Sequence, residues 1–122
     1  MASGEVVTGP SGEQVVLGDV GQEIVFENEH VRVWEVDLEP GEEQPWHRHH
    51  HPYLVIAIEA ADNRITPLDG GPPRDVHEAA GQVVFRDWAD AHKLTNRGQT
   101  RYRSRLVELK CLGAPTGAAP AT

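Results

Sequence analysis

The chain has little cysteine, no long apolar run and no residue pattern that predicts a secretory leader. Cys111 is its single cysteine, so no internal disulfide can form, which is compatible with a reducing compartment. No apolar run approaches the roughly 20 residues needed to span a bilayer. The first residues, MASGEVVTGPSGE, lack the basic end and the apolar stretch of a signal peptide. We therefore expect a cytoplasmic protein that does not enter a membrane.

Basic residues are also scarce. The formal net charge is −8 and the pI is near 5.2, which disfavours binding to nucleic acid or to an anionic membrane. With 122 residues, of which 39% are hydrophobic, the chain is long enough for one domain with one modest core. A small molecule is the partner that this composition leaves open.

Short segments of alternating apolar and polar residues, separated by turn residues, run through most of the chain. Such a pattern predicts an all-β fold, an antiparallel β-sandwich or jelly-roll barrel. We expect a loosely ordered N-terminal arm over residues 1–21, the barrel over 22–112 and a disordered tail over 113–122. The expected strands are Gln14–Leu17, Glu23–Glu27, His30–Leu38, a strand carrying the first histidines, Leu54–Glu59, Arg64–Leu68, Arg74–Glu78, Gln82–Arg86, His92–Thr95 and Thr100–Lys110.

Histidines cluster where a turn at Pro40-Gly41 leads into one of these strands. Because alternate side chains of an extended strand share a face, His47 and His49 are expected side by side. His92 lies more than forty residues further on. Three imidazoles suit zinc, iron, copper or nickel, and three protein ligands leave a coordination position open, as in catalytic sites. We predict a metal site at these histidines.

Two further residues share the strand parity of this pair. His51 is a rival ligand, although Pro52 interrupts the pattern, and it could equally lie on the rim. Tyr53 could donate a hydrogen bond to a group at the metal or act as an acid or base, or could simply pack at the rim. His50 is expected to point away.

At these positions the sequence resembles the cupins. Their first motif places a glycine five residues before His-x-His, as Gly41 stands before His47-Arg48-His49. Their second motif begins at a glycine matched by Gly81, and its histidine and asparagine are matched by His92 and Asn96. The resemblance covers roughly residues 22–111, and the tighter likeness, through Trp46-His47-Arg48-His49, is to the β-alanine degradation protein group. It implies a jelly-roll barrel that binds one divalent metal ion.

The sequence departs from the cupin motifs at several positions. Tyr53 stands where the first motif has a glutamate, often a fourth ligand, and Ala60 replaces a glycine. Asp87-Trp88-Ala89 replaces the Pro-x-Gly turn. The missing glutamate favours the three-histidine cupins, which include dioxygenases. The resemblance therefore implies Fe(II), with zinc, manganese, nickel or copper as alternatives.

Other residues are candidates for the substrate pocket. The predicted set is Trp46, His51, Val55, Arg86 and Trp88, with Tyr53 as the catalytic residue. The tryptophans could instead belong to the core. Arg101, Arg103 and Arg105 share one strand face and could bind a carboxylate or face solvent, while Glu35 or Glu108 could serve as a base.

One strand predicts an assembly. Tyr53, Val55 and Ala57 would line the interior, which leaves Leu54, Ile56 and Ile58 on an apolar outer face. Because such a face needs cover, we expect a homodimer.

Three functions are consistent with these features. The first is an O2-dependent oxidation of a small, possibly acidic, organic molecule, with Tyr53 steering oxygen or substrate. The second is a non-redox isomerase, cyclase, dehydratase or lyase that uses the ion as a Lewis acid. The third is a non-catalytic small-molecule-binding protein, since fold alone does not decide function.

Overall fold

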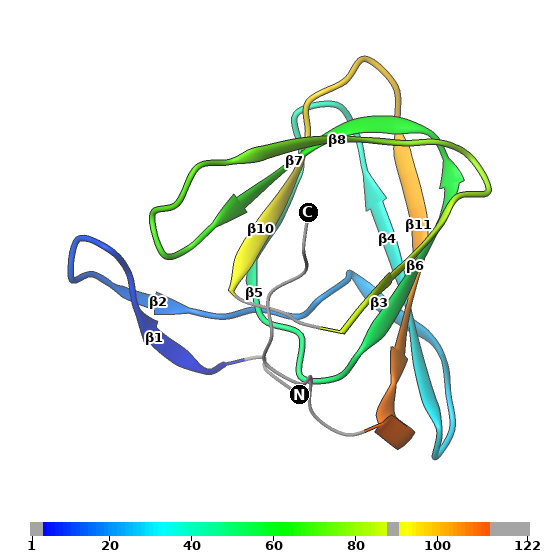
Figure 1. Cartoon of the computed structure of the whole chain (residues 1–122), viewed down its shortest axis with the longest axis horizontal. Coiled ribbons are helices and arrows are strands. Elements are labelled where there is room, and N and C mark those ends of the chain that lie inside the picture. The colour runs from blue at the N-terminus through cyan, green and yellow to red at the C-terminus, as the bar shows by residue number, and fades with distance from the viewer. Residues whose placement is uncertain (1–3, 88–90, 113–122) are drawn as a thin grey trace.

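A computed structural model describes residues 4–87 and 91–112 of the chain, and it is built almost entirely of β-strands (Figure 1). The described residues form eleven strands and one short 3-10 helix, η1 (Lys110–Leu112). The strands are β1 (Val6–Thr8), β2 (Gln14–Val16), β3 (Glu23–Glu27), β4 (Val31–Leu38), β5 (Glu43–His47), β6 (Tyr53–Glu59), β7 (Ala61–Pro67), β8 (Arg74–Glu78), β9 (Val83–Arg86), β10 (His92–Asn96) and β11 (Tyr102–Leu109). The predicted all-β class is confirmed.

Two antiparallel sheets enclose the interior of the molecule. One has the strand order β5-β10-β7-β8 and the other β3-β4-β11-β6-β9, and β1 and β2 form a separate hairpin. In Figure 1 the two larger sheets curve toward each other to form a barrel. The part of the chain that the structure describes contains no helix with the length and hydrophobicity of a membrane-spanning segment.

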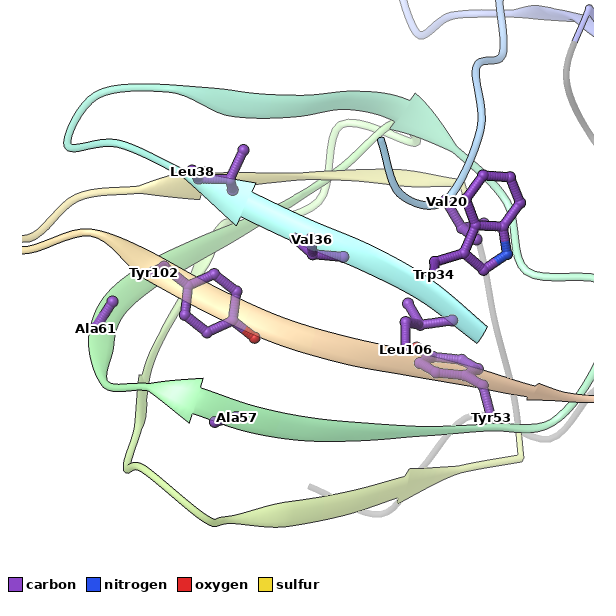
Figure 2. Packing of buried hydrophobic residues seen from close by; sticks show 9 residues of the cluster. All are labelled: Val20, Trp34, Val36, Leu38, Tyr53, Ala57, Ala61, Tyr102 and Leu106. Carbon is purple, nitrogen blue, oxygen red and sulfur yellow. The ribbon is translucent and has the colours of Figure 1, made fainter. Parts of the chain in front are cut away.

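Alternation along the central strands builds the core. In β11 the even-numbered residues are buried and the odd-numbered ones are only partly so, as expected for a sheet with one face turned inward. The same holds for Trp34, Val36 and Leu38 in β4, each at most 3% exposed. Figure 2 shows these side chains with Tyr102 at one end of the cluster and Tyr53 at the other. This core forms one wall of the barrel interior.

Residues 4–21, which fall within the predicted N-terminal arm, include two short strands. Val6 pairs with Val16 and Thr8 with Gln14 in the β1–β2 hairpin. Leu17, which is fully buried, packs with Leu68 and Ala91 in a second apolar cluster. Burial of this leucine fastens the segment to the barrel, which composition alone did not reveal. The predicted tail, 113–122, lies outside the described residues.

Two turns that contain glycine lead into strands that carry the site. Gly41 and Gly81 have φ angles of 87° and 82°, a left-handed conformation that side chains with a Cβ rarely adopt. Gly41 stands between β4 and β5, and Gly81 between β8 and β9. Both turns were expected from the sequence.

The strand that carries the first histidines is shorter than predicted. β5 ends at His47, the residue paired with His92 of β10, and residues 48–52 form an irregular connection to β6. Pro52 has no backbone N–H to continue a ladder. Strand parity therefore does not extend beyond His47, and His49 reaches the barrel interior from this connection.

Candidate metal centre

Three histidines from separate parts of the chain meet inside the barrel. One potential ligand atom from each of His47, His49 and His92 lies within 4.8 Å of the others. His47 and His92 are cross-strand neighbours on β5 and β10, with ring centroids 4.6 Å apart. The ring of His49 lies 5.1 Å from that of His47 and 5.3 Å from that of His92. The structure thus brings together the three residues predicted as metal ligands.

The hydrogen bonding of His47 orients its ring. Its Nδ1 lies 2.7 Å from the carbonyl oxygen of Pro45. A carbonyl can only accept, so Nδ1 donates and, in a neutral ring, Nε2 keeps its lone pair. Burial lowers the pKa of His47 to about 3, with a smaller contribution from the charge of His92. The imidazole is therefore neutral and able to bind a cation.

His49 carries an unmet polar atom. Its side chain is buried, and its Nδ1 has no hydrogen-bond partner among the residues that the structure describes. Burial, and then the neighbouring histidine His47, lower its pKa well below the ordinary value. Neutral buried imidazoles with free lone pairs are the donors that divalent transition ions prefer. The residues present therefore fit a bound divalent cation.

Tyr53, the predicted catalytic residue, packs directly against this group. Its ring stacks on His49 with centroids 3.8 Å apart and an interplanar angle of 11°, which restricts the orientation of the imidazole. Burial raises the pKa of Tyr53 to about 12, so its hydroxyl is protonated at neutral pH and can donate a hydrogen bond. A tyrosine here takes the place of the cupin glutamate but adds no negative charge.

Arg86 reaches the same end of the interior. It pairs with Tyr53 across β9 and β6, and cross-strand partners project to the same face. Its positive charge acts on the Tyr53 hydroxyl and favours the phenolate. Arg86 lines the cavity, where a cation can receive an anionic group.

A cavity of about 300 Å³ extends from the histidines through the barrel. Its walls are largely apolar, formed by Val36, Val55, Ile65, Val76, Val84, Leu94 and Leu106. Val55, which the sequence analysis proposed for the substrate pocket, is part of this wall. We call the part around His47, His49, His92, Tyr53 and Arg86 the metal end of the cavity.

The other part, which we call the far end, is centred on Glu78, Tyr102 and Asn63. The Tyr102 hydroxyl donates to Glu78 Oε1 at 2.7 Å, and Asn63 Nδ2 donates to Glu78 Oε2 at 2.7 Å. Burial and the Glu78 carboxylate raise the pKa of Tyr102 far above its ordinary value. Of these, Glu78 and Tyr102 line the cavity.

Sequence reasoning missed the far end, although a signal was present. In β8, Val76 and Glu78 share a face, and Val76 is the only apolar residue of that strand. In β11, Tyr102 lies on the face opposite the arginines. Both patterns indicate that Glu78 and Tyr102 face the interior. Gln44 of β5 also lines the cavity, but it stands between Glu43 and Pro45, and this strand shows no such alternation.

Two residues predicted for the pocket lie elsewhere and one lies outside the described residues. Trp46 packs against the apolar cluster around Leu17, with the Lys93 ammonium 4.8 Å from its ring centroid. His51 lines a small second cleft beside Glu108 and is not part of the three-histidine group. Trp88 falls among the residues that the structure does not describe.

The remaining charged candidates are held in ion pairs. Arg103 and Arg105 both bind Glu35 on the outer face of the larger sheet. Arg101 Nε donates to Asp37 Oδ1 at 2.7 Å. These pairs hold the three arginines on the outer face and keep Glu35 out of the cavity.

Glu108 and Asn96 have structural partners. Glu108 accepts a hydrogen bond from Trp34 Nε1 at 2.6 Å and pairs with Arg32 at 3.3 Å. Asn96 Nδ2 donates to the carbonyl oxygens of Leu38 and Thr100, so it fastens the turn after β10.

No protein-family model matches the sequence, and no curated protein does. Solved structures do match. A cupin domain from Bordetella pertussis Tohama I is 25% identical, with 72% of this chain and 90% of that chain covered and a TM-score of 0.66. An RmlC-like cupin family protein from Methanocaldococcus jannaschii, with a double-stranded β-helix fold, is 18% identical over 80% of this chain and 95% of that chain, with a TM-score of 0.54.

An uncharacterized protein with a double-stranded β-helix domain from Klebsiella pneumoniae is 21% identical over 80% of this chain and 78% of that chain, with a TM-score of 0.55. The fold of this chain is therefore the cupin fold, a double-stranded β-helix.

Proposed function

We propose that this cupin is a metal-dependent enzyme that oxidises a small organic anion with O2, as dioxygenases do. The metal would be one divalent ion, Fe(II) by preference, held by His47, His49 and His92. The observation that carries the proposal is the apolar cavity that opens directly onto three clustered imidazoles. Such walls exclude water and admit an apolar gas, while the open ligand set leaves room for a substrate.

Ferrous iron, when bound, would supply the redox chemistry that activates O2. The chain's own residues would bind and orient the substrate. Arg86 offers a cation to the anionic group of the substrate, and Tyr53 holds the His49 ring by stacking and presents a hydroxyl donor. Because neutral imidazoles add no charge, the positive charge of the ion is uncompensated by its ligands.

A second candidate is a non-redox reaction at the same site, an isomerisation, cyclisation, dehydration or other lyase reaction. The Tyr53 hydroxyl favours it, because a protonated phenol beside the ligands can deliver a proton. The same imidazole set suits zinc, which acts as a Lewis acid. Oxygen consumption separates the two candidates. A protein that binds its ligand without turnover is the third outcome.

We also propose that the chain forms a homodimer. Val83 and Phe85 of β9 are 58% and 50% exposed, and Ile58 of the adjacent β6 is 40% exposed. These residues form an apolar strip on the outer face of the larger sheet, and a second copy of the chain would cover it. Sedimentation of the wild type beside Phe85→Asp tests this, with a monomeric wild type as the contrary result.

The metal content of untagged, anaerobically purified protein tests the proposed function. We expect near-stoichiometric iron that disappears in the double variant His47→Ala/His92→Ala. The matched control is His30→Ala/His77→Ala, which removes two exposed histidines outside the group and should retain the metal. Zinc at the same stoichiometry would favour the non-redox candidate. A wild type without metal, even after reconstitution, would contradict both enzymes.

A further inference from the structure

The far end of the cavity holds a carboxylate whose negative charge no described residue neutralises. Glu78 accepts hydrogen bonds from the Tyr102 hydroxyl and the Asn63 amide, and both donors are neutral groups. Two arginines on neighbouring strands form ion pairs with other carboxylates. Arg64 pairs with Asp75, and Arg103 pairs with Glu35 and Glu59. Among the residues described, the ion pairs include none to Glu78.

The two neutral donors fix the carboxylate without saturating it. An ionised carboxylate has about four acceptor positions, and one is used on each oxygen. Asn63 is only 1% exposed, and its amide must present Nδ2 to Glu78, because the opposite orientation would set two acceptor oxygens against each other. Glu78 is therefore a held acceptor on the cavity wall, with capacity left for a donor from a bound molecule.

A second unmet acceptor lies along the cavity. Gln44 is 6% exposed, and its Nε2 donates to the carbonyl oxygens of Asp19 at 2.9 Å and Gly21 at 3.3 Å. These bonds fix the amide with Oε1 as the free atom, and Oε1 has no hydrogen-bond partner in the described part of the chain. Gln44 lines the same cavity as Glu78. The cavity therefore offers two hydrogen-bond acceptors to a bound molecule, whereas the cation Arg86 lies at the metal end.

The two ends are separated by a distance that one small molecule can span. His92 and Asn96 are four residues apart in β10, or about 13 Å along the strand. Across the sheet they pair with Pro67 and Asn63 of β7. Side chains from both ends reach inward and shorten that gap.

We propose that Glu78 is a specificity-determining residue that binds a hydroxyl or ammonium group of the substrate at the far end. The substrate is then a short chain with an anionic group at one end, toward Arg86, and a hydrogen-bond donor at the other. The inference rests on the proposed function in taking this cavity as the substrate site. The shared chemistry is hydrogen-bond donation to a carboxylate, which is stronger when the donor carries a positive charge.

Calorimetric titration with three matched compounds tests this. Hexanoate, 6-hydroxyhexanoate and 6-aminohexanoate have the same length and carboxylate and differ only at the far group. We expect wild-type protein, both zinc-loaded and metal-free, to bind one of the donor-bearing compounds at least about tenfold more tightly than hexanoate. Glu78→Gln should abolish a preference for the ammonium compound and weaken a preference for the hydroxyl compound only a few-fold, which distinguishes the two donors.

Two control variants separate binding at Glu78 from general effects. Asp75→Asn removes one carboxylate from the opposite, exposed face of the same strand and should leave the preference unchanged. Tyr102→Phe keeps the carboxylate but removes one of its two donors, so it should retain the preference and keeps the inference testable if Glu78 variants do not fold.

The proposal is overturned if hexanoate binds as tightly as both donor-bearing compounds, if none of the three binds, or if the preference survives Glu78→Gln for an ammonium ligand. Metal content measured on the same samples reports on the three histidines separately. Protein that binds metal but shows no donor preference keeps the proposed function and loses this inference. Protein that shows the donor preference but binds no metal keeps this inference and loses the proposed function.

Discussion

The two ends of the cavity offer different groups to what binds there. At the metal end, His47 and His49 are buried and neutral and one ring nitrogen of His49 is unmet, so these imidazoles can bind a metal ion. At the far end, the Glu78 carboxylate is held by two neutral donors, so it can accept a further hydrogen bond. The first arrangement suits a metal ion and the second suits a donor group of the substrate. A single cavity thus separates the binding of the ion from the selection of the ligand.

The largest effect should come from deleting a ligand at the metal end. His49→Ala removes one of three imidazoles, and we expect metal affinity to fall more than the roughly hundredfold reached by changes around metal ligands. Glu78→Gln, at the far end, should leave metal affinity within about threefold of wild type. Competition with a chromogenic chelator measures both. If Glu78→Gln lost the metal as well, the two ends would be a single unit.

A smaller loss, in stability rather than in metal affinity, should follow a change beside the far end. Asn96 is fully buried; its Nδ2 donates to two carbonyl oxygens, and its Oδ1 accepts from the Gly98 N–H. Asn96→Ala leaves these groups unpaired and should cost about 2–3 kcal/mol of unfolding free energy. Urea denaturation checks this.

The matched control for that variant is Asn28→Ala. Asn28 Oδ1 also accepts two backbone hydrogen bonds, but at an exposed turn where water can replace it. We expect a cost of about 1 kcal/mol or less. Equal costs for the two variants would show that Asn96 does not brace the barrel.

The difference between the ends also explains what the sequence could predict. Two metal-end ligands stand two positions apart behind a glycine turn, and the third follows a second glycine, so local spacing identified His47, His49 and His92. The far end draws Asn63, Glu78 and Tyr102 from three strands, and no local spacing links them. Only the register of β7 with β8 and the facing of β11 bring them together.

The fold was predicted from periodicity for the same local reason. Alternation and turn residues located ten of the strands, because each signal lies within a few residues. The position of His51 was not predictable, because parity holds only while a strand continues and β5 ends at His47. The β1 strand and the burial of Leu17 depend on contacts with Leu68 and Ala91, which are distant in the chain.

Each end of the cavity has one tyrosine, and removing the two hydroxyls in turn compares their contributions to stability. Tyr102→Phe removes a hydroxyl that donates to Glu78, and it should cost about 1–2 kcal/mol. Tyr53→Phe keeps the ring that stacks on His49 and should change stability by less than about 0.5 kcal/mol, since no hydrogen bond of this hydroxyl is found within the described residues. Thermal unfolding of both variants measures the difference. Equal losses of stability would mean that the Tyr53 hydroxyl also forms a stabilising hydrogen bond.

The smallest effect should come from an ion pair outside the cavity, which sets the scale for the others. Arg101 donates to Asp37 at the surface, and this hydrogen bond lowers the pKa of the Asp37 carboxyl. A carboxyl with a lowered pKa in the folded state stabilises the protein above its unfolded pKa, and the contribution is lost as the pH falls through the folded value. Asp37→Asn should therefore cost less than about 1 kcal/mol at pH 7, because solvent screens the pair, and nothing near pH 2. Urea titrations at both pH values measure this difference. A cost that stayed constant with pH would mean that the carboxylate charge contributes nothing, and that the hydrogen bond alone accounts for the loss.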